Sequence, residues 1–389
     1  MIPYARQHVT QADIDAVEAV LRSDFLTQGP TVPRLEHAVL RRTGAKRAIA
    51  VNSATSALHV ACLALDLGPG DLLWTVPNTF VASANCARYC GAMVDFVDID
   101  PVTWNISIDS LRTKLAAAQR ARCLPKIVVT VHFAGQPPQQ DAVAALSKEY
   151  GFRIIEDASH AVGASRSDEP VGSCRWSDIT IFSFHAVKII TTGEGGMALT
   201  NDETVADRMA LLRTHGVTRD PRAFANPDAR LDPPAWYYEQ QVLGFNYRMT
   251  DINAALGASQ LERLEDYVQR RNTLARRYDE ALRDLPLQLP TVLPENRSSF
   301  HLYVVRLHNG TPKSRRQVFD ELRARGIGVN VHYAPVHLQP YYRQLGFREG
   351  QYPEAEAYGR EAITLPLYAA MSASMQEQVV TSLRGTLSA

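Results

Sequence analysis

The stretch Ile127-Val128-Val129-Thr130-Val131 is an almost unbroken run of apolar, β-branched residues. Such a run favours a strand, and its lack of apolar–polar alternation indicates that both faces of that strand are buried. Parallel sheets are buried in this way because helices cover each side of them. The stretch therefore predicts a mostly parallel α/β sheet.

Further apolar runs alternate with helical patterns along the chain, on both sides of this stretch. The central strand is expected at 126–132, and further strands are expected at 48–51, 71–76, 93–97, 152–156, 178–184 and 196–200. Helices are expected between strands at 54–65, 80–89, 110–119 and 141–150. The alternation predicts a large α/β domain over residues 1–250, which includes an N-terminal arm.

The pattern changes after residue 215. Residues 221–234 hold four prolines and predict a long loop, and 251–283 predict one long helix. The remaining expected elements are a strand at 302–307, a helix at 315–325, a strand at 328–332 and a terminal helix. We therefore expect residues 251–389 to form a long linking helix and a small C-terminal α+β domain.

Composition narrows the class of protein. The chain has 389 residues with 41 basic and 41 acidic side chains, and no block of like charge occurs. This balance argues against binding to nucleic acid or to a membrane surface, and it is compatible with an oligomer. Residues 1–6 lack the apolar run of a signal peptide and 58–67 is too short to span a bilayer, so we expect a cytoplasmic protein.

The five cysteines form no C-x-x-C pair. Cys86 and Cys90 lie four residues apart on an expected helix, but no nearby histidine completes a metal site. We expect reduced, mostly buried thiols and no bound metal.

A lone lysine follows the expected strand at 178–184. The segment Ile181-Phe182-Ser183-Phe184-His185-Ala186-Val187-Lys188 leads to a turn that contains Gly193, Gly195 and Gly196. A lysine at the end of a buried strand is partly desolvated, which lowers its pKa and frees the amine to form a Schiff base with an aldehyde. Taken alone, the segment is better explained by an ordinary surface lysine.

Three other expected strand ends are unusual, and ligands collect at the carboxyl ends of strands in open α/β sheets. Residues 52–56 open a helix whose N–H groups and hydroxyls suit a phosphate, although a simple N-cap explains them better. Glu156 and Asp157 end a buried strand, where a carboxylate either keeps a pyridine nitrogen protonated or caps a helix. Phe80 begins a helix, where its ring either stacks on a pyridine or lies in the core.

These four signals occur in one order along the chain: phosphate turn, aromatic ring, carboxylate and lysine. No dinucleotide-binding or P-loop glycine motif competes with them. In this order they resemble the fold-type I pyridoxal-phosphate enzymes, and more narrowly the DegT/DnrJ/EryC1/StrS family of nucleotide-sugar aminotransferases. The resemblance is carried by segments that run nearly end to end: 25–30, 52–58, the Asp157 and Lys188 segments and 244–251.

Within that family the chain is most similar to the UDP-4-amino-4,6-dideoxy-N-acetyl-β-L-altrosamine transaminases of pseudaminic acid biosynthesis. The segments that carry this finer resemblance are 131–135, 156–161, 182–188 and 331–337. It implies transfer of the amino group of L-glutamate to C4 of a UDP-linked 4-keto-6-deoxy-N-acetylhexosamine, UDP-2-acetamido-2,6-dideoxy-β-L-arabino-hexos-4-ulose.

The family resemblance implies a role for each matching residue. Lys188 would hold pyridoxal 5′-phosphate as a Schiff base and move the proton. Asp157 would pair with the pyridinium nitrogen, His160 would contact the ring hydroxyl, and Phe80 would stack on the ring. The residues implied at the cofactor phosphate are Ala54, Thr55, Ser56, Ser183 and, reaching across a homodimer with shared active sites, Asn246. The residues implied at the sugar nucleotide are Tyr4, Asp24, Phe25, Leu26, Thr27, His185, His332, Tyr333, Ala334 and Pro335.

Three alternatives stay open. The first is an aminotransferase that acts on another UDP- or dTDP-keto sugar, because the loops that set the nucleotide and the sugar stereochemistry are not diagnostic. A sugar dehydratase of this fold would carry histidine in place of the lysine, and Lys188 argues against it although His185 lies three residues away. A non-catalytic protein of this fold would tend to lack the lysine or the ring carboxylate, and this chain has both.

Overall fold

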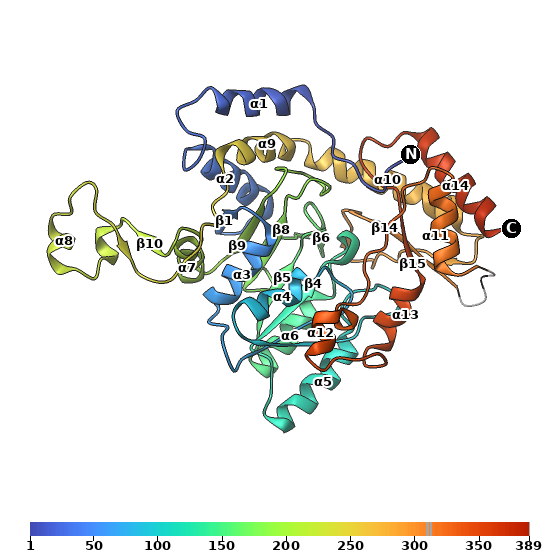
Figure 1. The fold of residues 1–389 in the computed structure, drawn as a ribbon, viewed down its shortest axis with the longest axis horizontal. Coiled ribbons are helices and arrows are strands. Elements are labelled where there is room, and N and C mark those ends of the chain that lie inside the picture. The colour runs from blue at the N-terminus through green and yellow to red at the C-terminus, as the bar shows by residue number, and fades with distance from the viewer. Residues whose placement is uncertain (309–310, 312, 389) are drawn as a thin grey trace.

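A seven-stranded sheet forms the centre of the molecule (Figure 1). The computed structural model describes residues 1–308, 311 and 313–388. In spatial order the strands are β1 (Arg47–Val51), β9 (Gly196–Thr200), β8 (Ile179–Ser183), β5 (Arg153–Asp157), β4 (Ile127–Val131), β2 (Leu72–Thr75) and β3 (Met93–Phe96). Strand β9 runs antiparallel to both of its neighbours, and the other adjacent pairs are parallel. The expected mostly parallel α/β sheet is confirmed.

Helices cover both faces of this sheet (Figure 1). They include α2 (Thr31–Thr43), α3 (Ala54–Ala64), α4 (Ala82–Tyr89), α5 (Ile108–Ala121), α6 (Gln140–Tyr150), α7 (Glu203–Arg213) and α9 (Asp251–Leu261). Helix α1 (Gln11–Leu21) packs on α9 outside this layer. Successive residues of a strand point to opposite faces. Phe182 and Met197 therefore share a core with α2 and α9, whereas Ile181 and Ala198 share a core with α3. These two cores explain the continuous apolar runs in the sequence.

A smaller antiparallel sheet follows in the C-terminal part of the chain. It contains β12 (Leu287–Gln288), β14 (Tyr303–Leu307) and β15 (Ala362–Leu365), which are packed with α10 (Leu264–Leu282), α11 (Arg315–Ala324) and α14 (Ala373–Leu387). The short helices α12 (Pro340–Gln344) and α13 (Pro353–Glu361) lie between β14 and β15 in the sequence, and β6 (Ser165–Arg166), β7 (Glu169–Pro170) and β13 (Asn296–Arg297) form a separate small sheet. The division of the chain into two domains at residue 250 stays a prediction.

Two expected elements differ from the structure. The expected single helix over 251–283 breaks at Arg263, whose backbone leaves helical geometry where its guanidinium reaches the buried carboxylate of Asp13 at 2.5 Å. The expected strand at 328–332 is wrong, because this segment makes only isolated bridges. The N-terminal segment lies against it, and the N–H of Gly328 donates to the carbonyl of Ile2 at 2.7 Å.

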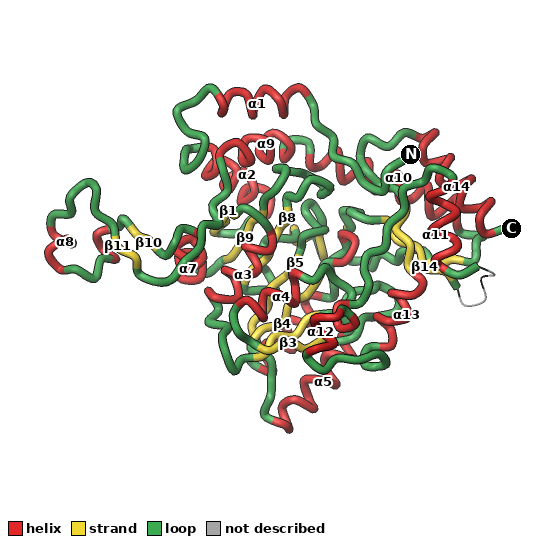
Figure 2. Tube along the Cα trace, in the orientation of Figure 1, coloured by secondary structure: helices red, strands yellow, loops and turns green. Residues whose placement is uncertain are grey.

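Residues 216–243 project from the body of the molecule, and we call them the hairpin arm (Figures 1 and 2). Strands β10 (Val217–Thr218) and β11 (Glu239–Gln240) pair at its base, and α8 (Pro227–Leu231) lies toward its tip. The expected loop at 221–234 thus contains a short helix. Leu231, Trp236 and Leu243 are 89%, 73% and 82% exposed, so the hairpin arm presents apolar side chains that nothing in its own chain covers.

Two further expectations concern surfaces and thiols. None of the helices within the described ranges has both the length and the apolar character needed to cross a bilayer. Four of the five cysteines are buried and Cys123 is exposed, and all five are free thiols, as expected. The residues that the structure describes contain no cluster of three or more side chains suited to hold a metal ion.

Candidate functional site

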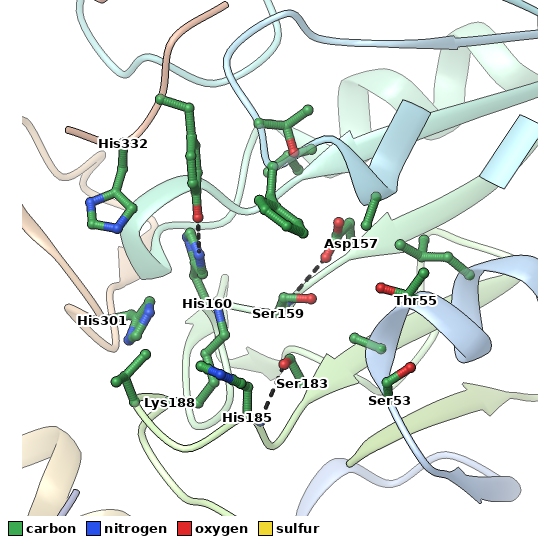
Figure 3. A pocket seen from close by; sticks show the side chains of 18 of the residues that line it. Ser53, Thr55, Asp157, Ser159, His160, Ser183, His185, Lys188, His301 and His332 are labelled. Carbon is green, nitrogen blue, oxygen red and sulfur yellow. Dashed lines mark hydrogen bonds between the residues drawn. The ribbon is translucent and has the colours of Figure 1, made fainter. Parts of the chain in front are cut away.

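One cavity of about 410 Å³ gathers most of the residues selected from the sequence (Figure 3). It opens where strands end: Ala54 follows β1, Phe80 follows β2, Asp157 ends β5 and Ser183 ends β8. The selected residues that line it are Tyr4, Ala54, Thr55, Phe80, Asp157, His160, Ser183, His185, Lys188, His332 and Tyr333. The sheet topology therefore explains why segments far apart in the sequence meet here.

The first turn of α3 forms one end of this cavity. The hydroxyl of Ser53 accepts the N–H of Ser56 at 3.1 Å as an N-cap, while the N–H groups of Ala54 and Thr55 have no partner within the helix. Strand β9 presses against this turn, since a Cβ added to Gly196 would lie 2.5 Å from the nitrogen of Ala54. A helix N-terminus fixed in this way attracts phosphate. The hydroxyl of Ser56 itself donates to Asn52 at 2.7 Å and supports the turn from outside the cavity.

Two consecutive carboxylates end β5, and they point to different places. Asp157 lines the cavity, where its Oδ2 accepts the hydroxyl of Ser83 at 2.6 Å and its Oδ1 accepts the N–H of Ser159 at 3.2 Å. Glu156 points away from the cavity and lies 2.9 Å from His132, with both side chains buried. The alternation of side chains along a strand separates the two carboxylates.

Lys188 lies in the loop between β8 and β9, with its side chain partly exposed to the cavity. The N–H of Phe184 donates to the carbonyl of Gly195 at 2.9 Å, and the N–H of Lys188 donates to the carbonyl of His185 at 2.9 Å. Desolvation lowers the pKa of Lys188 to about 8, against the opposing attraction of Asp157. About a tenth of the amine is therefore neutral at pH 7, far more than for an ordinary lysine.

Several imidazoles surround this amine. His160, His301 and His332 all line the cavity, and the hydroxyl of Tyr333 lies 3.1 Å from Nε2 of His160. Desolvation, assisted by the charge of Lys188, holds the pKa of His160 and of His301 well below the usual value and lowers that of His332 to about 4. All three rings are thus neutral at physiological pH.

The two ends of the cavity differ in what they offer a ligand. Figure 3 shows His301, His332 and Lys188 on the side opposite Ser53 and Thr55, with Asp157 between them. His185 is half-exposed, with its Nε2 3.8 Å from Glu194. The first turn of α3 therefore faces a group of neutral imidazoles and the amine of Lys188, with Asp157 between them.

Several selected residues do not line the cavity of their own chain. Asp24, Phe25, Leu26 and Thr27 are exposed beside the start of α9, and Thr27 forms a bridge with Thr250. Asn246 is also exposed, and its carbonyl accepts the side-chain amide of Asn52 at 3.4 Å. Ala334 and Pro335 lie directly after Tyr333 in the sequence but are not among the lining residues. The roles of these residues stay predictions.

Among the residues of the site that were not selected from the sequence, Ser159, Ser83 and His301 matter most to its chemistry. Ser159 lies between Asp157 and His160 in the sequence, so its position near the site follows from theirs. Ser83 lies three residues after Phe80, one turn into a helix that begins at a strand end, which is a usable signal. His301 comes from the C-terminal part of the chain just before β14, and no local pattern distinguishes it.

The comparisons with known proteins agree with this geometry. Residues 7–384 match the DegT/DnrJ/EryC1/StrS aminotransferase family. The chain belongs to this family. It is 38% identical, over 98% of this chain and 96% of the relative, to the spore coat polysaccharide biosynthesis protein SpsC of Bacillus subtilis.

Solved structures of family members superpose on nearly the whole chain. The putative sugar aminotransferase Spr1654 of Streptococcus pneumoniae, in its PMP form, has a TM-score of 0.89 at 29% identity and covers 100% of this chain and 99% of its own. PseC of Helicobacter pylori, an aminotransferase involved in pseudaminic acid biosynthesis, has a TM-score of 0.90 at 30% identity with the same coverage. The fold is therefore that of the fold-type I aminotransferases.

This member of the family is a sugar aminotransferase that depends on pyridoxal 5′-phosphate. Its cavity fits that cofactor on observations of its own: N–H groups without helical partners at α3, a carboxylate held by Ser83 and Ser159, and an amine whose pKa lies near 8. PseC is one of several neighbours at about 30% identity, so the comparisons resolve the family but not the sugar.

Proposed function

We propose that the protein transfers the amino group of L-glutamate to C4 of UDP-2-acetamido-2,6-dideoxy-β-L-arabino-hexos-4-ulose, as in pseudaminic acid biosynthesis. The observation that supports transamination most directly is a lysine of lowered pKa in the same cavity as Asp157 and the first turn of α3. The choice of sugar is supported by the likeness to PseC over the whole chain.

In this proposal Lys188 carries the protons. The bound cofactor supplies an electron sink, which stabilises the negative charge left when a carbon loses its proton. Nζ of Lys188 takes that proton and returns it to the second carbon, because one flexible amine beside both carbons serves both directions. A pKa near 8 suits this exchange, since the amine has to accept and release a proton at the same pH.

The other selected residues position the reactants. Asp157 would keep the cofactor ring nitrogen protonated, and its bonds to Ser83 and Ser159 fix its orientation. Ala54, Thr55 and Ser183 would hold the phosphate, and Ser56 supports the turn through its bond to Asn52. Phe80 is 58% exposed with its ring in the cavity, which leaves a face free for stacking. His160, which lies 3.1 Å from the hydroxyl of Tyr333, would contact the ring hydroxyl of the cofactor.

The test is an assay of purified protein with L-glutamate against a panel of UDP- and dTDP-linked 4-keto sugars. We expect the highest kcat/KM for the UDP-linked β-L-arabino 4-ketose. L-Glutamate alone is expected to shift the absorbance of the yellow holoenzyme, because the donor half-reaction needs no sugar. A clear preference for another keto sugar would reject the proposed substrate while leaving transamination intact.

A second candidate is the same chemistry on another UDP- or dTDP-keto sugar. The 38% identity to SpsC favours it, since that relative bears a name from spore coat polysaccharide biosynthesis. The same panel separates the two candidates. Turnover of a sugar that lacks the acetamido group at C2, with no turnover of the proposed sugar, would support the second.

We further propose a homodimer with shared active sites. The support is that Asn246 and residues 24–27 are exposed outside the cavity of their own chain, and that Asn246 lies three residues after the exposed Leu243 of the hairpin arm. Asn246 would then reach the cofactor phosphate of the neighbouring subunit. A C2 dimer is also the commonest oligomer.

Subunit mixing tests this dimer. Lys188→Ala and Asn246→Asp are each expected to be inactive, the second because its charge repels the phosphate. In a mixed dimer one site carries both changes and the other carries neither, so about half of the hybrid sites regain activity. No recovery after subunit exchange, or an active monomer by sedimentation, would reject the shared site.

A further inference from the structure

His301 is the imidazole of the cavity for which the structure provides no partner. Its side chain is 3% exposed and lines the cavity, and its Nδ1 has no hydrogen-bond partner among the described residues. Nδ1 of His160 also lacks a partner among the described residues, but Nε2 of that ring lies 3.1 Å from the hydroxyl of Tyr333. Nδ1 of His332 lies 2.8 Å from the hydroxyl of Thr364. Each of these two rings therefore has at least one hydrogen-bonding contact, whereas the ring of His301 has none among the described residues. A buried polar group without a partner is costly unless a ligand supplies one.

The chain holds His301 in place from several sides. The buried guanidinium of Arg271 donates to the carbonyls of Phe300 and His301 at 3.2 and 3.3 Å. The hydroxyl of Ser299 donates to the carbonyl of His160 at 2.9 Å, which ties the two histidine segments together. The rings of His160 and His301 lie with their centroids 4.5 Å apart. Such support is typical of a side chain whose position matters for a ligand.

The cavity has few other groups that attract an anion. Among the described residues that line it, Lys188 is the only lysine or arginine, and the proposed chemistry already uses that amine. The α3 turn, which suits the cofactor phosphate, lies at the opposite end (Figure 3). An amino-acid donor nevertheless brings a carboxylate next to the reacting carbon, beside Lys188. Figure 3 shows His301 on that side of the cavity.

We infer that His301 binds the α-carboxylate of the amino donor. This inference deepens the proposed function and rests on it, since it names the group that recognises the acid. The neutral imidazole donates a hydrogen bond to the carboxylate, and the positive field of the nearby Lys188 and Arg271 adds a longer-range attraction.

Binding of the donor carboxylate is also coupled to proton uptake by the protein. Desolvation and the charged or ionisable groups around the ring, which are Lys188, His160, Arg271 and His332, hold the pKa of His301 well below its usual value. A carboxylate against the imidazole favours its protonated form and raises that pKa. His301 therefore takes up a fraction of a proton from solvent when the acid binds near neutral pH.

The test uses glutarate, which has the two carboxylates of glutamate but no amino group to react. Calorimetric titration of the holoenzyme in two buffers of different ionisation enthalpy gives both Kd and the number of protons taken up. We expect proton uptake of less than one per site in the wild type. His301→Leu is expected to raise Kd about 10-fold or more and to abolish the uptake.

A second variant separates loss of the hydrogen-bond donor from loss of the titrating group. His301→Gln keeps an amide donor of similar reach but has no titrating group, so it should bind glutarate more tightly than His301→Leu and show no uptake. This variant also keeps the test decisive if His301→Leu does not fold. The matched control is His332→Gln, at a cavity histidine already satisfied by Thr364, which should retain the wild-type proton uptake.

The inference is overturned if the wild type takes up no proton, or if either His301 variant binds glutarate with wild-type affinity and wild-type uptake. These outcomes are distinct from failure of the proposed function. The sugar panel decides that function, whereas the glutarate titration contains no sugar and requires no turnover.

Discussion

Glu156 and Asp157 are neighbours in the sequence and are both buried, yet they lie in two very different environments on opposite faces of β5. Glu156 meets His132 at 2.9 Å beside a space of only about 10 Å³. Asp157 borders the cavity of about 410 Å³, together with an amine of lowered pKa. A buried carboxylate therefore does not by itself mark a site. The free volume beside Asp157, and the amine of Lys188 that shares it, mark the site.

The largest effect is expected from removing the amine of Lys188, which shares the cavity with Asp157. Lys188→Ala should keep the fold and lose turnover by roughly four orders of magnitude or more, because the covalent and proton-transfer roles disappear together. Single-turnover absorbance with L-glutamate measures the loss, and circular dichroism checks the fold. Borohydride trapping of the cofactor on any lysine other than Lys188 would falsify this assignment.

The comparison between the two faces is sharpest in a pair of matched variants. Asp157→Asn should slow both half-reactions by about 100-fold or more while leaving the fold intact, because the ring nitrogen loses its ionic partner. Glu156→Gln should instead lower the free energy of unfolding by about 1–3 kcal/mol and change turnover little, because it disrupts a buried polar pair outside the cavity. Stopped-flow rates and urea unfolding of both variants measure the two effects. If Glu156→Gln abolished turnover and Asp157→Asn did not, the assignment of the two faces would be reversed.

A smaller effect is expected in how pH controls cofactor uptake. With a pKa of about 8 for Lys188, the neutral amine should increase about 10-fold between pH 7 and pH 9 and then level off. An ordinary lysine would increase about 100-fold over that range and continue to rise. The rate at which apoenzyme recovers the yellow absorbance with added pyridoxal 5′-phosphate measures this. A rate that still climbs steeply above pH 9 would contradict a desolvated amine.

The smallest effect concerns stability in acid. His160, His301 and His332 have pKa values lowered by desolvation, so the unfolded chain binds more protons than the folded one. The free energy of unfolding is unaffected by them above about pH 6.5 and falls below it, by about 1 kcal/mol per pH unit for each histidine, down to about pH 4 for His332. Urea unfolding of the apoprotein between pH 7 and pH 5 should show this slope, and His301→Gln should reduce it. An unchanged slope in that variant would mean that His301 is not buried neutral.

Much of the fold and part of the site could be predicted because both depend on local pattern. The apolar run of β4 gives a sheet buried on two faces, and parallel strand ends meet at one edge, which brings Ala54, Asp157 and Lys188 together. The features that could not be predicted from the sequence depend instead on contacts between residues that lie far apart along the chain. The expected long helix is interrupted at Arg263, whose guanidinium contacts Asp13, and Gly328 donates its N–H to Ile2 of the N-terminal segment. His301 reaches the cavity because Arg271 and Ser299 hold its segment there, and no local spacing encodes those contacts.

The antiparallel placement of β9 has a consequence for motion. Because β8 and β9 are adjacent, the loop that carries Lys188 begins and ends at one place, and the bonds from Phe184 to Gly195 and from Thr192 to Phe184 fasten it there at 2.9 Å. The backbone of this loop can remain still throughout a reaction cycle, while the lysine side chain turns about its own bonds. Side-chain rotations are completed in picoseconds to nanoseconds, whereas loop and domain rearrangements take microseconds to milliseconds. The amine can therefore reorient far faster than any rearrangement of the loop that carries it.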